Sequence, residues 1–263
     1  YEPFADNLGA WSEGKLMESN IMRELLAKKK NFVFIGEAGS GKSELAMNFA
    51  QLMAEVSEKP VHLFDMDQTK GLFRTRDVSE LLEEKGIIVH SQKQLLDAPT
   101  IVPGVIETLT DPDAYVLMDI GGNAAGARMI GQFSHILNDD STCVFFVINT
   151  YRPWSKDAMS INDTLYSITR VSRLRKVNII SNPNLGLTTT PDEVVEGNEK
   201  LKKILEGGDV GIDYVCVLSE LYDEVKDRIE EPLIPIDIFI IYPWLFRNPG
   251  KIIPEGPRGL SMR

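Results

Sequence analysis

A glycine-rich stretch between an apolar run and an amphipathic segment constrains this chain more than any other feature. The apolar run is 32–35, the glycine-rich stretch reads G-E-A-G-S-G-K-S over 36–43, and the amphipathic segment is 44–56. The spacing is that of a Walker A loop, whose glycines let backbone N–H groups curl around a polyphosphate. We therefore predict a strand, a phosphate loop and a helix whose positive dipole end faces the phosphates.

The predicted nucleotide ligands are the eight residues of this loop, namely Gly36, Glu37, Ala38, Gly39, Ser40, Gly41, Lys42 and Ser43. Lys42 is expected to reach the terminal phosphates and to act in catalysis, and the Ser43 hydroxyl to bind Mg²⁺. The alternative is a strand-to-helix turn whose glycines serve tight packing alone.

Composition narrows the class of protein. The chain has 263 residues, 43% of them apolar, which suits one large α/β domain. A net charge of −11 argues against a broad nucleic-acid or anionic-membrane surface, so we expect small-molecule or protein partners. No apolar run is long enough to span a membrane. The two cysteines, Cys143 and Cys216, lie far apart, each in an apolar run, so we predict that both are buried thiols. Without a disulfide framework, a cytoplasmic location is expected.

Strands and helices are expected to alternate along the chain. Strand patterns fall at 32–35, 61–67, 87–90, 114–119, 143–148, 177–182 and 213–218, with an irregular edge strand at 234–241. Helical patterns fall at 16–30, 44–56, around Leu81 and Leu82, and at 102–109, 124–137, 155–176, 191–205 and 222–229. This order predicts an open, mostly parallel sheet of seven or eight strands with helices on both faces. The expected divisions are an N-terminal arm and helix (1–30), a P-loop ATPase domain (31–246) and a C-terminal tail (247–263).

Three carboxylates are expected at the sheet edge that carries the phosphate loop. Asp65 and Asp67 end the second strand and project to the same side, and Asp119 ends the fourth strand as a Walker B acid would. Mg²⁺ bound to ATP is held through one or two carboxylates plus phosphate oxygens, so these acids suffice for a metal ion and an attacking water. Ordinary turn aspartates are the alternative for each.

The base-binding end of the site has a weaker signal. The chain lacks the N-K-x-D signature of GTP-specific proteins. Asn182, at the end of the sixth strand, can hydrogen-bond an adenine edge, with Asn184 as second choice, whereas structural caps explain such asparagines about as often. We therefore expect ATP rather than GTP.

The chain resembles the MinD/ParA branch (SIMIBI class) of P-loop ATPases in the order of its motifs. These are the loop, the Asp65-Met-Asp67 pair, the Asp119-Ile-Gly-Gly122 turn and Asn182. That group includes the nitrogenase iron protein, the arsenite-pump ATPase and ATPases that insert nickel or mature metalloenzymes. The resemblance implies an ATP-gated homodimer that switches a partner protein. It also implies that Asp67 positions the catalytic water and that Asp65 and Asp119 support Mg²⁺.

One position departs from that family. Its members carry K-G-G-x-G-K-[ST], in which the first lysine reaches the partner's nucleotide, whereas this chain has Glu37 there. A carboxylate cannot neutralise phosphate charge, so either another cation acts or the chain does not hydrolyse ATP through a sandwich dimer. The candidate cations are Arg74, Arg76, Arg128 and Arg152.

Three functions remain open from the sequence. The first is a Mg-ATP-dependent ATPase (a hydrolase) that switches a partner protein, as in metalloenzyme maturation or activation. The second is a small-molecule kinase or ATP-dependent ligase on the same fold. The third is a scaffold that binds ATP without turnover, which Glu37 favours.

Overall fold

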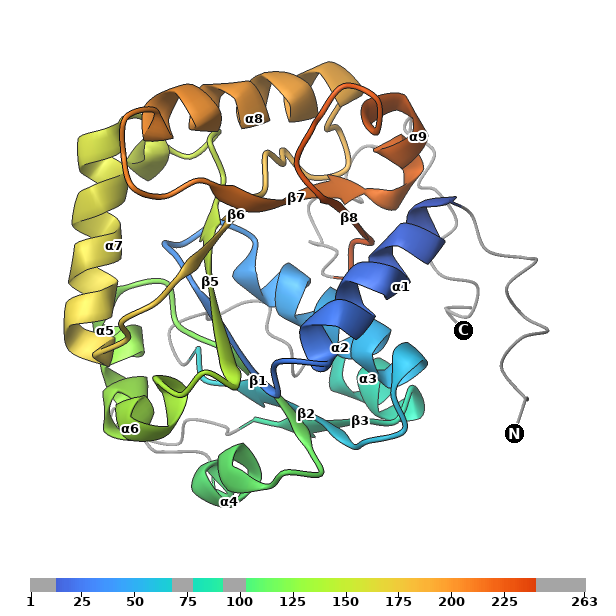
Figure 1. Cartoon of the computed structure of the whole chain (residues 1–263), viewed down its shortest axis with the longest axis vertical. Helices are drawn as coiled ribbons and strands as arrows, with labels where there is room; N and C mark the ends of the chain where they lie inside the picture. The colour runs from blue at the N-terminus through green and yellow to red at the C-terminus, as the bar shows by residue number, and fades with distance from the viewer. Residues whose placement is uncertain (1–12, 68–77, 92–102, 240–263) are drawn as a thin grey trace, which may run out of the picture.

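A computed structural model describes residues 13–67, 78–91 and 103–239 of the chain. Its centre is one sheet of eight parallel strands in the order β3-β2-β4-β1-β5-β6-β7-β8 (Figure 1). The strands are β1 (Asn31–Ile35), β2 (Val61–Asp65), β3 (Ile87–His90), β4 (Tyr115–Asp119), β5 (Thr142–Ile148), β6 (Asn178–Ser181), β7 (Ile212–Leu218) and β8 (Leu233–Ile236). With the phosphate loop joining β1 to the next helix, this confirms the predicted α/β fold of P-loop NTPases.

Helices cover both faces of the sheet, as Figure 1 shows. The α-helices are α1 (Glu13–Leu26), α2 (Lys42–Val56), α3 (Ser79–Glu84), α4 (Val105–Thr110), α5 (Ala124–Arg128), α6 (Ser134–Leu137), α7 (Ala158–Ser172), α8 (Pro191–Leu205) and α9 (Tyr222–Val225). Short 3₁₀ helices are η3 (Met129–Phe133), η4 (Pro153–Ser155) and η5 (Ser219–Leu221). Among the described residues no helix is long and apolar enough to cross a membrane.

Alternate residues of the central strands supply two separate cores. Phe32 and Phe34 of β1 pack with α1, α2 and α3 on one face, whereas Val33 and Ile35 pack with α4 to α8 on the other. Strand side chains alternate between faces, so a strand with helices on both sides must be apolar at every position. β5 is buried along its whole length for this reason.

Several predicted boundaries were wrong. The helix expected at 124–137 is three short pieces, α5, η3 and α6, and Gly126 and Gly131 within it disfavour one continuous helix. The helix expected at 155–176 begins only at 158, where Asp157 caps it by accepting from Ser160 N, and ends at 172. Helix α9 is shorter than expected, and the edge strand β8 ends at Ile236.

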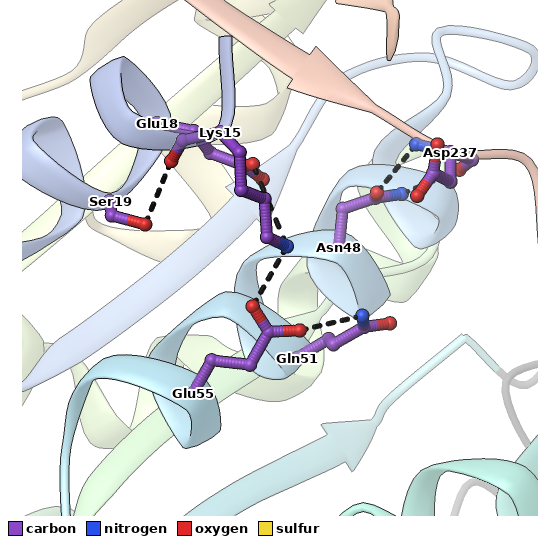
Figure 2. A network of polar contacts seen from close by, with 7 residues as sticks. All are labelled: Lys15, Glu18, Ser19, Asn48, Gln51, Glu55 and Asp237. Atoms are coloured by element: carbon purple, nitrogen blue, oxygen red, sulfur yellow. Dashed lines mark hydrogen bonds and ion pairs between the residues drawn. The ribbon is translucent and has the colours of Figure 1, made fainter. Parts of the chain in front are cut away.

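Polar contacts fasten α1 and the segment after β8 to α2 (Figure 2). The Asn48 amide pairs with both backbone groups of Asp237, donating to its carbonyl and accepting from its N–H at 2.8 Å each. Lys15 of α1 forms an ion pair with Glu55 of α2 at 2.8 Å. Burial raises the pKa of Glu18 to about 7, with the Glu55 and Asp237 charges adding to the rise against Lys15.

Candidate functional site

The phosphate loop has the backbone conformation that its glycines predict. Gly36, Gly39 and Gly41 all have positive φ, at 143°, 78° and 99°. At Gly41 a Cβ would lie 2.2 Å from Asn182 Nδ2, so only glycine fits between the loop and the end of β6. Helix α2 begins immediately afterwards at Lys42, which places its positive dipole end on the loop.

The loop also holds its basic and hydroxyl residues in place. Lys42 is 2% exposed and its Nζ donates to the Glu37 carbonyl at 3.2 Å, across the loop. Ser43 is buried beside it. A lysine charge so sheltered from water suits a dense anion such as a triphosphate.

Side chains that lie just past the ends of two neighbouring strands hold the carbonyl groups of the loop. Asn182, just past β6, donates from Nδ2 to the Ser40 carbonyl at 2.8 Å. Arg152, in the turn after β5, donates from Nε to the Gly39 carbonyl at 3.0 Å. Of the four arginines considered as cations, Arg152 is thus placed at the loop, through a contact to its backbone. Arg128 is exposed at the end of α5, and the other two, Arg74 and Arg76, lie outside the described residues.

The three predicted carboxylates lie together at the same edge. Asp119 is in register with Phe34 of β1 and with Asp65 of β2, so the two acids are on adjacent strands. Asp65 Oδ1 accepts from the Asp67 N–H at 3.1 Å. Asp65, Asp67 and Asp119 are 6%, 2% and 1% exposed. The cluster is therefore buried beside the strand that carries the phosphate loop.

This arrangement fits Mg²⁺ bound together with phosphate. Asp119 Oδ1 is buried and makes no hydrogen bond within the described part of the chain. In residues 13–67, 78–91 and 103–239 no group of three His, Cys, Asp or Glu is arranged to hold a metal ion. Mg²⁺ needs no such cage, because it keeps waters and takes phosphate oxygens as ligands. Ser43, Asp65 and Asp119 are the residues that would hold it.

The turn after β4 packs directly on the phosphate loop, a contact that the sequence pattern did not predict. A Cβ at Gly122 would lie 2.7 Å from Ala38 N, and one at Gly121 would lie 3.2 Å from Asp67 Oδ1. The glycine pair thus lets Asp67 and the loop approach the same turn. The Gly-Gly sequence that follows Asp119 is the signal from which this contact could have been predicted.

Two expected binding residues have structural contacts of their own. Glu37 Oε1 accepts from the Ala38 N–H at 3.1 Å, so its carboxylate is folded onto the loop backbone. Asn184 Oδ1 accepts from Gly186 N at 2.6 Å, and its carbonyl accepts from Asn149 Nδ2 at 2.7 Å. These contacts give Asn184 a structural role in its turn and leave Asn182 as the asparagine at the loop.

No protein-family model and no curated protein sequence matches the chain. Similar solved structures include the cell division protein FtsY from Thermotoga maritima, 18% identical over 76% of this chain and 68% of that chain, with a TM-score of 0.45. FlhF complexed with GTP and Mg²⁺ is 16% identical over 78% and 77%, with a TM-score of 0.41. HypB from Helicobacter pylori in complex with nickel is 14% identical over 78% and 86%, with a TM-score of 0.37. At these values the similarities carry no conclusion about what this chain binds.

Proposed function

We propose that this protein binds Mg-ATP through the 36–43 loop and uses it as a nucleotide-dependent switch of the MinD/ParA type. The observation that carries the proposal is the convergence of the phosphate loop with the buried Asp65, Asp67 and Asp119 at the carboxyl edge of the sheet. Ligands of open parallel sheets bind at that edge. A packing turn needs glycines, but it does not need a buried lysine and three buried acids beside them.

Each residue has a role that follows from its position. Lys42 would neutralise the terminal phosphates, and Ser43, Asp65 and Asp119 would hold Mg²⁺, which would supply charge neutralisation and polarise the phosphoryl group. Asp67 orients the attacking water, since it lies beside the metal-holding acids and leans on the turn at Gly121.

The contacts of Asn182 support a preference for adenine over guanine. Its Nδ2 donates to the loop, and its buried Oδ1 has no hydrogen-bond partner among the described residues. An amide oxygen accepts from the exocyclic amino group of adenine, whereas the corresponding edge of guanine presents only acceptors. An unpaired buried acceptor is costly, so a bound adenine would relieve it.

The switch would act through the glycine turn. Gly122 packs on Ala38 and Gly121 packs on Asp67. A movement of the loop around a γ-phosphate would therefore displace residues 119–122. A partner protein or a second copy of the chain would read that movement, as in metalloenzyme maturation or activation.

The proposal is tested by nucleotide competition and by phosphate release. If Asn182 reads the base, unlabelled ATP displaces labelled ATP at a lower concentration than GTP does. Asp67→Asn then loses hydrolysis while it keeps ATP affinity, because the interaction with water exists mainly in the transition state. Tighter displacement by GTP would overturn the adenine assignment, and loss of binding in Asp67→Asn would place Asp67 among the metal ligands.

One observation favours a second candidate function, a scaffold that binds ATP without turnover. The residue at the family's lysine position, Glu37, is turned onto its own loop and offers no positive charge to phosphate. Binding of labelled ATP with no phosphate release, alone or with partners and small acceptors, would support the scaffold.

A further inference from the structure

A pocket of about 650 Å³ lies at the edge of the sheet opposite the phosphate loop. Its two halves are α6 with the loop that follows it before β5, and the turn between α7 and β6. Both loops lie at the amino ends of strands. In Figure 1 the end of α7 lies beside α6. The length of β5 separates the two edges, roughly 20 Å at the usual rise of a strand. This pocket is therefore no part of the nucleotide site.

The pocket is lined by polar residues, of which the two arginines carry the donor groups that recognise oxyanions. The lining residues are Ser134, His135, Asn138, Asp139, Arg173 and Arg175. Both arginines are exposed, and within the described part of the chain neither guanidinium makes a hydrogen bond or an ion pair. Two unpaired guanidinium groups at one pocket present planar sets of donors that match phosphate and carboxylate oxygens.

The side chain of Asn138 holds the backbone of both arginines at the pocket. The Asn138 side-chain amide donates to the Arg173 carbonyl at 2.9 Å and accepts from the Arg175 N–H at 3.0 Å. It also donates to the Ser134 carbonyl at 2.8 Å. One side chain thus joins the two halves of the pocket and sets the turn that displays both guanidinium groups.

Arg173 occupies a position that ordinarily belongs to glycine. It caps α7 with φ 59° and ψ 22°, and it is the one non-glycine residue with positive φ in the described ranges. Helix ends of this kind use Gly because a Cβ is unfavourable there. The helix dipole does not require the arginine, since Arg170 already lies in the last turn of α7. A side chain kept at such a position points to a function for it.

The surrounding charges are mixed. Asp139 faces the same pocket, and the Ser141 N–H that it accepts at 2.9 Å holds the pKa of its carboxyl below the usual range. Asp140 is paired with Lys176 at 2.9 Å. Asp139 therefore opposes one of the two arginine charges and weakens the attraction of the pocket for an anion.

We propose that this pocket is a second anion site, which takes the phosphate or carboxylate group of a small molecule between Arg173 and Arg175. The site is independent of the proposed nucleotide switch. Its test uses Lys42→Ala as background, because that variant lacks the lysine of the competing phosphate loop.

Calorimetric titration of inorganic phosphate, and separately of citrate, measures the site. Adding Arg173→Gly or Arg175→Gln weakens binding by about tenfold or more, the value of a charge-assisted hydrogen bond. Asp139→Asn strengthens binding, and Arg23→Gln, which removes an exposed arginine of α1, leaves it unchanged. A stronger response to phosphate or to citrate identifies the group that the site prefers.

Arg173→Gly also separates a binding role from a structural one. Glycine suits the backbone at this position, so the variant melts at the same or a higher temperature than its parent. An arginine that binds no anion predicts unchanged anion affinity in this variant, whatever its melting temperature, and that result would overturn the proposal. Equal weakening by Arg23→Gln, or binding of neither anion by the Lys42→Ala background, would overturn it too.

Discussion

Asn182 Nδ2 donates to the Ser40 carbonyl at 2.8 Å and so ties the end of β6 to the phosphate loop. Asn182→Ala removes this bond and the amide that we propose reads the base. We expect a loss of about 1 to 2 kcal/mol of stability, because the Ser40 carbonyl loses a buried partner. We also expect ATP and GTP to compete equally.

Denaturant unfolding and nucleotide competition measure the two effects. Asn184→Ala is the control, since that side chain serves its own turn. An Asn182→Ala protein that still prefers ATP would show that the base is read elsewhere.

Gly122 of the turn after β4 packs on Ala38 of the loop. Gly122→Ala would place a Cβ 2.7 Å from Ala38 N, nearer than real Cβ atoms approach, so the loop must shift. We expect ATP affinity to fall by about tenfold or more and stability by roughly 1 to 3 kcal/mol. Gly211→Ala, where nothing lies within 4 Å, leaves both unchanged. Undiminished ATP affinity in Gly122→Ala would separate this turn from the site.

Glu37 is where the chain departs from the MinD/ParA pattern, and Glu37→Lys introduces the lysine of that pattern. The lysine would present a positive charge to a bound nucleotide in place of a carboxylate that now accepts from Ala38 N. We expect a rise in basal ATP hydrolysis or in ATP-dependent dimerisation, measured by phosphate release and light scattering. No change in either, with the fold intact, would remove the analogy with ATP-gated dimers.

Glu18 makes stability depend on pH. Its folded pKa of about 7 lies above the ordinary 4.5, so the native state keeps the proton longer than the unfolded chain does. Stability from this group is therefore full below pH 4.5 and falls as pH rises to about 7, by on the order of 2 kcal/mol. The charged groups around it are Lys15, Glu55 and Asp237 (Figure 2).

Glu18→Gln removes that fall. Urea unfolding at pH 5 and pH 8 compares it with the parent protein and with Glu24→Gln, an exposed glutamate of the same helix. We expect Glu18→Gln to gain stability relative to its parent at pH 8 but not at pH 5. An equal difference at both pH values would contradict the raised pKa.

The fold could be predicted from the sequence because, along most of the chain, the spacing of apolar residues agrees with the residues that end helices and strands. The G-x-x-x-x-G-K-S spacing located the turn from β1 to α2, and acids at strand ends located Asp65 and Asp119. The strand order was not predictable, because it depends on which side of β1 each crossover takes. The contacts of Arg152 and Gly122 with the loop arise from that order, which brings the ends of β5 and β4 beside β1.

Helix boundaries failed where tertiary contacts decide them. The pattern at 124–137 reads as one helix, but the close approach of α7 requires glycine at 131, and glycine disfavours a helix interior. Similarly, nothing in the sequence places Asn138 beside Arg173, since the contact joins segments 35 residues apart.

The central claim is that Lys42 and its loop hold the phosphates of Mg-ATP. Its most direct test is equilibrium binding of labelled ATP, with Mg²⁺ present, to the parent protein, to Lys42→Ala and to Lys59→Ala. Lys59 is an exposed lysine whose Nζ donates to the Pro112 carbonyl away from the loop. We expect Lys42→Ala to weaken binding by about a hundredfold and Lys59→Ala to leave it unchanged. Equal ATP affinity in a folded Lys42→Ala protein would contradict the account.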